Sequence, residues 1–403
     1  MTATPDVASA PTTEEQRVDR RIAELLAAHD PQTTPPAEFL GAQFDLGLAW
    51  VSFPEGHGGL GLSPRLQKQV NERLAAVGSP SAALRNIIGH GMAAPTVVAH
   101  GSEAQRRRLL RPLFTGDEIW CQLFSEPAAG SDVASLAARA VRDGDEWIVN
   151  GQKVWTTLAH LARWGLLVAR TDPRQPKHKG LTYFVVDMQA SGVEVKPLYQ
   201  ITSEAEFNEV FFTDVRIPDA DRVGDVGDGW RVALTTLMNE RVAIGGGIPP
   251  RGGGLIGEAV RLWRAHGHTD PVRRDELMRL WVAAEALRLT NIRAQQARAM
   301  GTPGPEGSIG KVFLADLNRQ ISEFALNLLG PVGMLYPNGY RFERPRHAMP
   351  YVDPQQAFLR ARANSIEGGT SEIMRNILGE RVLGLPREPR VDKELPWSQV
   401  PRN

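Results

Sequence analysis

The residues best suited to chemistry lie in one stretch, residues 120–132, which reads Trp-Cys-Gln-Leu-Phe-Ser-Glu-Pro-Ala-Ala-Gly-Ser-Asp. An apolar run typical of a strand leads into a Pro-Ala-Ala-Gly turn, which ends in Ser131 and Asp132. Such a turn exposes several backbone N–H groups beside short hydroxyl side chains. Because flat heteroaromatic rings and pyrophosphate oxygens need donors at close range, the stretch is suited to a ligand of that kind.

Two further motifs follow. Residues 151–157 read Gly-Gln-Lys-Val-Trp-Thr-Thr, and residues 365–373 read Ser-Ile-Glu-Gly-Gly-Thr-Ser-Glu-Ile. Taken alone, Trp155 could be a core aromatic of a sheet and Ser125 a turn hydroxyl, since both structural roles are common. Cys121 is expected to be a packing residue, because no basic residue nearby in the sequence would favour a thiolate.

A glycine-rich segment, residues 56–61 (Gly-His-Gly-Gly-Leu-Gly), matches the spacing of a dinucleotide-binding fingerprint. A true fingerprint needs a preceding strand and a βαβ unit around it. The surrounding pattern is helical and Pro64 follows shortly, so the segment is predicted to be a loop between helices.

The composition excludes several classes of protein. Lys plus Arg and Asp plus Glu are equal at 46 each, so there is no overall basic field for nucleic acid or an anionic membrane. No apolar run approaches the length of a membrane-spanning helix, and the first residues lack the layout of a signal peptide. The single cysteine excludes an internal disulfide and fits a reducing compartment. We therefore expect a cytoplasmic protein of two or three subdomains, since 403 residues exceed one ordinary core.

The hydrophobic periodicity divides the chain into parts. Residues 1–14 are rich in Thr, Ala and Pro and are expected to be disordered. Helical spacing then dominates an N-terminal domain of residues 15–118. The helices are expected at residues 15–28, 36–48, 62–77, 81–100 and 103–113.

The period changes from 3.6 to 2 after Trp120, which predicts a central antiparallel β domain, a barrel or sandwich, of residues 119–226. Asp-Gly-Asp at 143–145 and Asn-Gly at 150–151 are expected to be its first two turns. The strands are expected at residues 138–141, 147–149, 153–157, 164–169, 182–187, 193–198 and 209–212.

Helical spacing returns from Gly229 and predicts a C-terminal four-helix bundle of residues 227–383. Its later helices are expected at residues 255–265, 273–300, 309–329 and 353–380. The tail, residues 384–403, carries four prolines and is predicted to be extended, lying on a neighbour.

Together these features resemble the acyl-CoA dehydrogenases, from about residue 15 to residue 389. The flavin-binding signature of that family is Thr/Ser-Glu-Pro-x-Ala-Gly-Ser-Asp, and residues 125–132 are similar to it. The resemblance implies an α+β fold with an N-terminal helical domain, a central β domain and a helical bundle. It also implies FAD as cofactor, an acyl-CoA substrate and an electron-transferring flavoprotein as electron acceptor. Oxidising a saturated thioester needs a hydride acceptor, a base for the α proton and donors for the carbonyl, and no side chain accepts a hydride.

The resemblance also assigns cofactor-binding residues. It places residues of the first motif against the flavin ring or near the flavin phosphates and the pantetheine arm, Trp155 and Thr157 beside the ring, and Thr370 and Glu372 at the FAD diphosphate and ribose. The segment 327–333, which holds Gly330, stands where the family often has Gln-x-x-Gly-Gly-x-Gly at the adenine end. The predicted cofactor-binding residues are Gln122, Phe124, Ser125, Gly130, Ser131, Trp155, Thr157, Gly330, Thr370 and Glu372. No metal site is expected.

The catalytic base has two candidates. Many members of the family carry it immediately before Gly-Thr, where this chain has Gly368, and Glu367 is one residue off, about 100° around a helix. Isovaleryl-CoA and long-chain acyl-CoA dehydrogenases carry it instead at a Glu-Arg site, which Glu240 and Arg241 match. Glu240 is therefore the predicted base with Arg241 supporting it, Glu367 is the lesser candidate, and the backbone N–H near Gly368 is expected to polarise the carbonyl. The alternative is that Glu240 is a solvated residue paired with an arginine.

Two other functions stay open at this point. One is a flavin monooxygenase or oxidase on the same fold, and the other is a largely structural subunit of a heteromeric dehydrogenase. The absence of a clean Arg-x-x-Phe-Gly element between Arg241 and Leu280 motivates the second, since in the family those residues reach the FAD of a neighbouring subunit. The variant motifs, including Pro-Gly-Pro-Glu-Gly-Ser at residues 303–308, resemble those of actinobacterial relatives, some of which form α2β2 tetramers. A homo-oligomer or a heterotetramer is therefore expected. The acyl group, whether fatty, branched, aromatic or sterol-derived, stays open.

Overall fold

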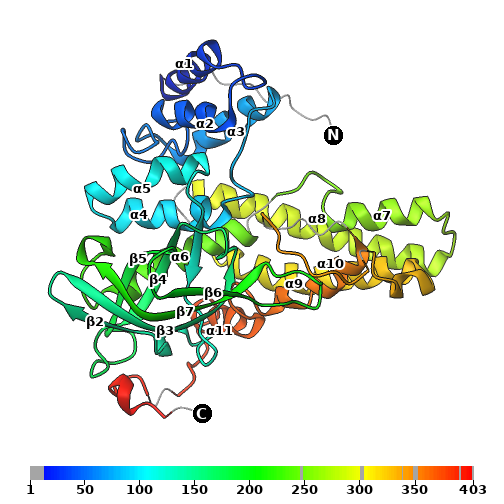
Figure 1. The fold of residues 1–403 in the computed structure, drawn as a ribbon. Coiled ribbons are helices and arrows are strands. Elements are labelled where there is room, and N and C mark those ends of the chain that lie inside the picture. The colour runs from blue at the N-terminus through cyan, green and yellow to red at the C-terminus, as the bar shows by residue number, and fades with distance from the viewer. Residues whose placement is uncertain are drawn as a thin grey trace. The chain divides into compact units, whose positions relative to one another are not determined.

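A computed structural model describes residues 13–245, 248–299, 304–337, 339–347, 353–389 and 392–401 (Figure 1). The chain divides into two compact units. One unit is made of the chain up to Asn86 together with Gly101–Ile119, and the other of Ile87–His100 together with the chain from Trp120 onward. The predicted order of a helical part, a β part and a helical bundle is confirmed.

The first unit is helical. Its core is formed by apolar side chains at helical spacing, among them Val18, Ile22 and Leu25. The glycine-rich segment 56–61 is a loop, as predicted. A Cβ atom at Gly59 would lie 2.0 Å from the carbonyl oxygen of Phe53, so only glycine fits there. The helices are α1 (Thr13–Ala28), α2 (Pro36–Asp45), η1 (Pro64–Leu66), α3 (Gln67–Ala76) and α5 (Glu103–Thr115).

The helix predicted for residues 81–100 begins later than expected. Residues 81–86 form a turn, and helical structure starts at residue 87, continues through a π-helical turn, η2 (Gly89–Ala93), and ends with α4 (Ala94–His100). The side chain of Asn86 donates to the carbonyl oxygens of Leu113 at 2.8 Å and Glu118 at 3.1 Å. These bonds fix the chain in a turn, and the prediction of helix over 81–86 was wrong.

The β part is one sheet of eight strands in the order β6-β7-β3-β2-β4-β5-β8, with β1 pairing parallel to β4. The long strands alternate buried and more exposed residues, and β5 is buried along almost its whole length. The strands are β1 (Trp120–Leu123), β2 (Arg139–Asp143), β3 (Glu146–Thr157), β4 (Trp164–Arg170), β5 (Leu181–Asp187), β6 (Val193–Pro197), β7 (Phe207–Pro218) and β8 (Arg222–Val223).

The turn predicted at Asn150-Gly151 is wrong, because β3 runs through it without reversing. Its pairing with β7 shifts register between Val149 and Gly151, as in a β-bulge. A Cβ atom at Gly151 would lie 2.6 Å from the Cβ of Ala138, so glycine is needed for close approach rather than for a hairpin. A second shift, between Lys153 and Thr156, surrounds Trp155.

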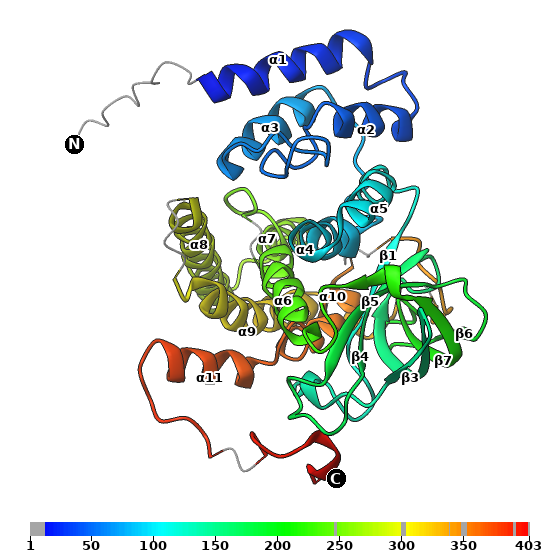
Figure 2. The same cartoon turned by 90° about the vertical axis from the view of Figure 1, so that its left-hand side faces the viewer.

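The C-terminal bundle contains α6 (Gly229–Gly245), α7 (Leu255–Ala265), α8 (Pro271–Ala299) and α9 (Glu306–Leu328). Its core includes Leu262, Leu280 and Phe324. Helix α6 packs on β4 and β5 on one side and on α9 on the other, so it lies between the sheet and the rest of the bundle (Figure 2). Among the described helices, none is long and apolar enough to cross a membrane.

The helix predicted for residues 353–380 is broken in two. Helix α10 (Pro354–Arg360) and helix α11 (Ser371–Arg381) are separated by a connection that includes the short helix η6 (Ala363–Ser365). Gly368 and Gly369 both have positive φ, 62° and 89°, a conformation that ends helical periodicity and favours glycine. The tail reaches the β part of its own chain, where Trp397 is buried at the start of η7 (Trp397–Gln399).

Candidate functional site

A buried ion pair joins the first two motifs. The Nζ of Lys153 donates to Oε1 of Glu126 at 2.8 Å and to the carbonyl oxygen of Phe124 at 3.0 Å. The Glu126 carboxylate also accepts the backbone N–H groups of Ala137 and Ala138, at 2.6 and 2.9 Å. The side chain of Lys153 is fully buried, and burial lowers its pKa while Glu126 opposes that change. Sequence reasoning missed this pair, although both charges stand inside the motifs.

The ion pair leaves polar atoms of both motifs partly accessible. Gln122, Ser125 and Thr157 are half-buried, and Gly130 and Ser131 are exposed. The two segments run side by side, because the backbone N–H of residue 154 donates to the carbonyl of residue 125 at 2.9 Å. The structure therefore brings five of the predicted cofactor residues onto the same part of the β domain.

Trp155 stands out in this region. Its side chain is 57% exposed, and its backbone has a φ of 60°, which is strained for a bulky residue. The indole ring meets the ring of Phe207 edge-on, with the centroids 5.9 Å apart. A large aromatic held outward by a strained backbone indicates a candidate functional surface.

Phe124 and Cys121 are buried. The Phe124 side chain is 4% exposed and meets the ring of Tyr183 edge-on at 5.9 Å, so only its backbone is available to a ligand. Cys121 is fully buried, and burial raises the pKa of its thiol. A thiol in that environment is unreactive, which agrees with the expected packing role.

Glu240 lies within reach of the first motif. The Nε2 of Gln122 donates to Oε2 of Glu240 at 3.3 Å, linking β1 to α6. One turn earlier in α6, the hydroxyl of Thr236 is within 2.9 Å of the hydroxyls of both Thr96 and Tyr183. This buried hydroxyl cluster fixes the position of α6 and hence of Glu240. The side chain of Arg241 lies outside the described residues.

Glu367 is held by its own neighbours. The guanidinium of Arg360 donates to both of its carboxylate oxygens, at 2.8 and 2.5 Å, and Asn364 donates to Oε1 at 2.8 Å. Arg360 also lies over the ring of Phe207, with its guanidinium carbon 5.8 Å from the ring centroid. A carboxylate with this bidentate partner is poorly suited to accept a proton from carbon.

Lys311 is a residue that the sequence analysis did not single out. Its side chain is 7% exposed, and its Nζ donates to the carbonyl oxygen of Asn364 at 2.8 Å. Burial lowers the pKa of Lys311, and the negative charges of Glu367, Glu372 and Glu240 oppose this effect. Lys311 thus connects α9 to the loop before Gly368 and lies in the field of Glu240.

The third motif forms a loop and a helix start. The hydroxyl of Thr370 accepts the backbone N–H of Ile373 at 3.1 Å and so caps α11. Glu372, in the first turn, is exposed and pairs with Arg375 at 3.5 Å. The N-terminal end of this helix favours negative charge, as a diphosphate would supply.

Gly330 is separated from these residues. It follows the C-terminal end of α9 with a φ of 56°, whereas Lys311 lies near the other end of that helix. The separation along the helix axis is roughly 25 Å at 1.5 Å per residue. Within one chain, the predicted adenine-end residue is therefore not part of the cluster around Glu240.

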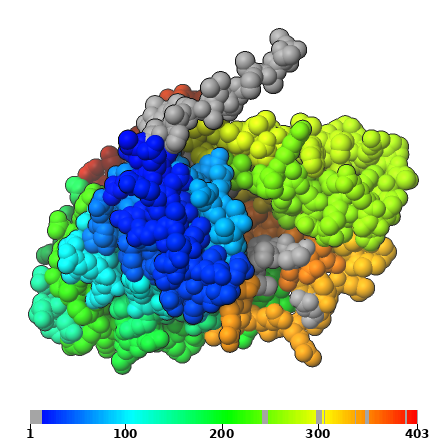
Figure 3. Space-filling model, turned by 90° about the horizontal axis from the view of Figure 1, so that it is seen from above, coloured from blue at the N-terminus to red at the C-terminus, as the bar shows by residue number. Residues whose placement is uncertain are grey.

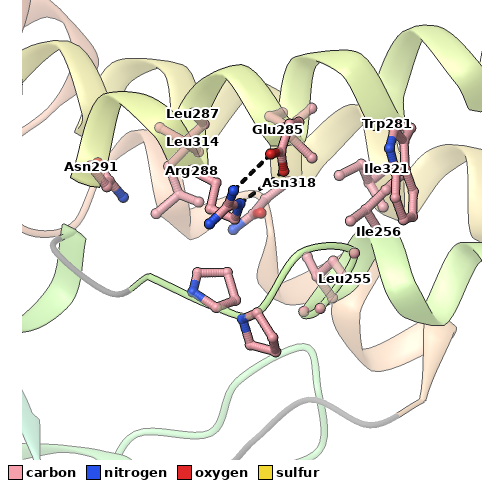
Figure 4. Close-up of a pocket in the computed structure, with 17 residues that line it drawn as sticks. Leu255, Ile256, Trp281, Glu285, Leu287, Arg288, Asn291, Leu314, Asn318 and Ile321 are labelled. Atoms are coloured by element: carbon pink, nitrogen blue, oxygen red, sulfur yellow. Dashed lines mark hydrogen bonds and ion pairs between the residues drawn. The ribbon is translucent and has the colours of Figure 1, made fainter. Parts of the chain in front are cut away.

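A pocket of about 310 Å³ lies inside the bundle, between the loop after residue 248 and helices α8 and α9 (Figure 4). It is mainly apolar, with the ion pair of Glu285 and Arg288 at 2.8 Å on its wall. None of its lining residues is a predicted site residue, although Asn318 donates to the side chain of Asn364 at 3.1 Å. In the described part of the chain, no group of three His, Cys, Asp or Glu residues could hold a metal ion.

Comparisons with known proteins agree with the order of a helical part, a β part and a helical bundle. Residues 12–117, 121–215 and 227–383 match the profiles of the N-terminal, middle and C-terminal domains of acyl-CoA dehydrogenase. The acyl-CoA dehydrogenase IpdE1 of Mycobacterium tuberculosis is 40% identical over 351 residues, which are 85% of this chain and 86% of that protein.

Two solved structures are also similar. The ChsE4-ChsE5 complex from Mycobacterium tuberculosis is 28% identical, with a TM-score of 0.68 over 95% of this chain and all of the other chain. The protein described as the Tcur3481-Tcur3483 steroid ACAD is 26% identical, with a TM-score of 0.70 over the same shares.

Proposed function

Because the chain belongs to the acyl-CoA dehydrogenase family, we propose that it desaturates an acyl-CoA thioester between the α and β carbons to give the trans-2-enoyl-CoA. The observation that carries this proposal is the hydrogen bond between Gln122 and Glu240. It joins a carboxylate of the bundle to the strand that leads into residues 125–132, which are similar to the family's flavin-binding signature. A base next to a flavin is the pair of groups that this reaction needs.

The residues of the β domain fit a bound FAD. Outward-facing Trp155 offers an aromatic surface for a flat ring, and the hydroxyls of Ser125 and Thr157 offer hydrogen bonds at its edge. The glycine turn at Gly130 and the capped start of α11 at Thr370 supply backbone N–H groups for phosphate oxygens. When bound, FAD would accept the hydride that leaves the β carbon.

Glu240 is the proposed base. Its carboxylate accepts a hydrogen bond from the side chain of Gln122 in a half-buried position, and we assign to it the removal of the α proton. Glu367, the other candidate, has its carboxylate occupied by Arg360 and Asn364. The bidentate arginine on Glu367 and the contact of Glu240 with the first motif together support Glu240.

The proposed carbonyl donor is the backbone N–H near Gly368. The left-handed conformations of Gly368 and Gly369 turn the chain sharply before α11, and Lys311 holds the preceding residues through Asn364. A backbone N–H fixed in this way can stabilise the enolate-like charge that grows on the thioester oxygen as the α proton leaves.

The proposed substrate is a bulky acyl-CoA, including acyl groups derived from a steroid. This choice is supported by one similar structure, which is described as a steroid ACAD and is 26% identical over 95% of this chain. The proposed electron acceptor is an electron-transferring flavoprotein, which the family resemblance implies.

The proposed assembly is an oligomer, either of identical chains or with a related subunit. Helix α8 exposes the apolar residues Met278, Val282 and Leu289, which share one side of the helix at spacings of four and seven. Part of this helix is visible on the surface in yellow in Figure 3. One of the similar structures is a complex of two named chains, which supports a heteromeric assembly as one form of the proposal.

The test is anaerobic mixing of the FAD-loaded full-length protein with a panel of acyl-CoAs, including straight-chain, branched and steroid-derived thioesters. The absorbance of the oxidised flavin should bleach with at least one class. The Glu240→Gln variant should bleach about 10²–10⁴-fold more slowly, because it lacks the base. The Glu367→Gln variant is the matched control and should stay within tenfold of the wild type.

Other outcomes would change the proposal. Full FAD occupancy without bleaching by any thioester, combined with rapid oxygen consumption after chemical reduction, would replace it by the oxidase or monooxygenase. Failure of the isolated chain to retain FAD would indicate the structural-subunit alternative and a missing partner.

A further inference from the structure

The C-terminal tail returns to the β domain and binds two of its loops. The backbone N–H groups of Trp397 and Ser398 donate to the carbonyl oxygens of Gln175 and Pro173, both at 2.9 Å. The indole N–H of Trp397 donates to the carbonyl oxygen of Ser135 at 3.1 Å. The tail therefore bridges the loop between β4 and β5 and the segment 130–136, which begins with Gly130 and Ser131.

Arg170 contacts both the tail and the segment 130–136. Its guanidinium lies over the ring of Trp397, 4.6 Å from the centroid, and its Nη2 donates to the carbonyl oxygens of Ala134 at 2.6 Å and Leu136 at 3.3 Å. The arginine is almost fully buried. Trp397 covers this guanidinium, so the indole contributes to the support of the segment 130–136 both directly and through Arg170.

Lys177 adds an ionic link on the other side of the same segment. Its Nζ contacts the carboxylates of Asp132 at 2.8 Å and Asp392 at 2.7 Å. Burial disfavours the charge of Lys177, but the two aspartates outweigh it and raise its pKa. Two separate interactions, one aromatic and one ionic, thus attach the tail to the segment.

We propose that Asp392 and Trp397 of the tail belong to the machinery that binds the CoA portion of the substrate, with Trp397 as a positioning residue for the segment 130–136. The inference rests on the proposed function, and on the family resemblance, which implies that Gly130 and Ser131 lie near the flavin phosphates and the pantetheine arm. Trp397 acts on coenzyme A through Ser135 and Arg170 and not by direct contact. Loss of Trp397 therefore weakens binding of coenzyme A while the reacting groups around Glu240 stay in place.

The geometry distinguishes this role from general packing of a tail. A tail that only covers apolar surface would present apolar atoms, whereas here the indole N–H of Trp397 donates to Ser135, and Lys177 joins Asp132 of the segment to Asp392 of the tail. Gln399, in the same turn of the tail, is exposed and serves as a control position. Its side chain can be removed without touching the segment.

The experiment measures binding of coenzyme A by calorimetry to FAD-loaded full-length protein. Trp397→Ala should raise the Kd at least tenfold, and Trp397→Phe, which keeps the ring over Arg170 but lacks the N–H donor, should raise it by a smaller factor. Gln399→Ala should stay within twofold of the wild type. With any acyl-CoA that bleaches the flavin, Trp397→Ala should raise KM and leave kcat within twofold, at unchanged FAD content.

The inference would be overturned by a Trp397→Ala variant that keeps FAD and binds coenzyme A as tightly as the wild type, whatever its Tm. If Trp397→Ala does not fold, Trp397→Phe and Asp392→Asn decide, and unchanged Kd values in both overturn the inference. Wild-type protein that holds FAD but does not bind coenzyme A would instead remove the proposed function, and this inference with it.

Discussion

The side-chain amide of Gln122 donates a hydrogen bond to the carboxylate of Glu240 across 3.3 Å. The two residues are 118 positions apart in the sequence, and one lies in a strand and the other in a helix. Since a hydrogen bond to a carboxylate favours its charged form, Gln122 both orients the proposed base and keeps it ready to accept a proton.

The first prediction removes this bond. Gln122→Leu should move the acidic limb of the pH profile for flavin bleaching to higher pH, by about half a unit to one unit, because the ionised carboxylate loses a donor. On the acidic limb itself, the rate at a given pH should fall about three- to tenfold. The measurement is the single-turnover rate between pH 5 and 9.

The control for Gln122 is Gln152→Leu. Gln152 belongs to the second motif, and its side chain donates to Glu209 at 3.1 Å. The Gln152→Leu substitution therefore removes a similar amide from the same domain but leaves the contact to Glu240 in place. Its acidic limb should coincide with that of the wild type. A Gln122→Leu profile that coincides as well would show that the bond has no role in the proton transfer.

The second prediction concerns the buried pair of Lys153 and Glu126. Lys153→Met should be strongly destabilising, by about 3–5 kcal/mol, because the Glu126 carboxylate would stay buried without its cation. The variant should also lose FAD, since the pair aligns the two motifs. Thermal unfolding and the FAD content of the purified protein measure both effects.

A double variant tests the reason for this cost. Lys153→Met combined with Glu126→Gln removes both charges of this pair, and the amide oxygen can still accept a backbone N–H in place of the carboxylate. It should therefore be more stable than Lys153→Met alone. A double variant less stable than the single one would contradict the electrostatic explanation and point to packing instead.

Much of the arrangement follows from patterns that are local in the sequence. The change of period near Trp120 predicts the start of the sheet, and the return of helical spacing at Gly229 predicts the bundle. The signature around Ser125 identifies the region of the candidate site, because its turn residues have a specific chemical use.

Other features depend on contacts that no local pattern contains. Asn150-Gly151 has the composition of a hairpin turn, but the close approach of Ala138 uses the glycine for a bulge. The charge of Lys153 would normally predict a solvent-exposed position, and only the fold supplies Glu126 as its buried partner. The proline-rich tail gives no sign that Trp397 will bind beside Ser135.

The third prediction uses His160. Burial lowers the pKa of this histidine, and the charge of Arg344 acts in the same direction, against the hydrogen bonds to Pro345 and Asn208. The folded-state pKa thus lies below the unfolded value of about 6.5. Between the two values the unfolded chain binds more protons, so the stability associated with neutral His160 is complete above pH 6.5 and is lost as pH falls through the folded pKa.

The expected measurement is the Tm between pH 7.5 and 5. The Tm of the wild type should fall over this range, and His160→Gln should reduce the fall, because the glutamine amide can donate to the carbonyl of Pro345 without titrating. His100 also has a pKa lowered by burial, so part of the slope should stay. A variant with the same slope as the wild type would show that His160 does not contribute.

The last prediction concerns Lys311, which links the two halves of the proposed active site. Its hydrogen bond to Asn364 holds the loop before Gly368, and its charge lies in the field of Glu240. Lys311→Met should lower the Tm and move the acidic limb of flavin bleaching to higher pH by about half a unit, because a nearby cation favours an ionised carboxylate.

Lys311→Gln separates the effect of the charge of Lys311 from the effect of its hydrogen bond to Asn364. The glutamine amide keeps a donor that can reach toward the carbonyl of Asn364, but it carries no charge. If the charge of Lys311 acts on Glu240, the acidic limb should move in both variants, while the Tm should fall mainly in Lys311→Met. A limb that stays in place in both variants would restrict Lys311 to holding the loop.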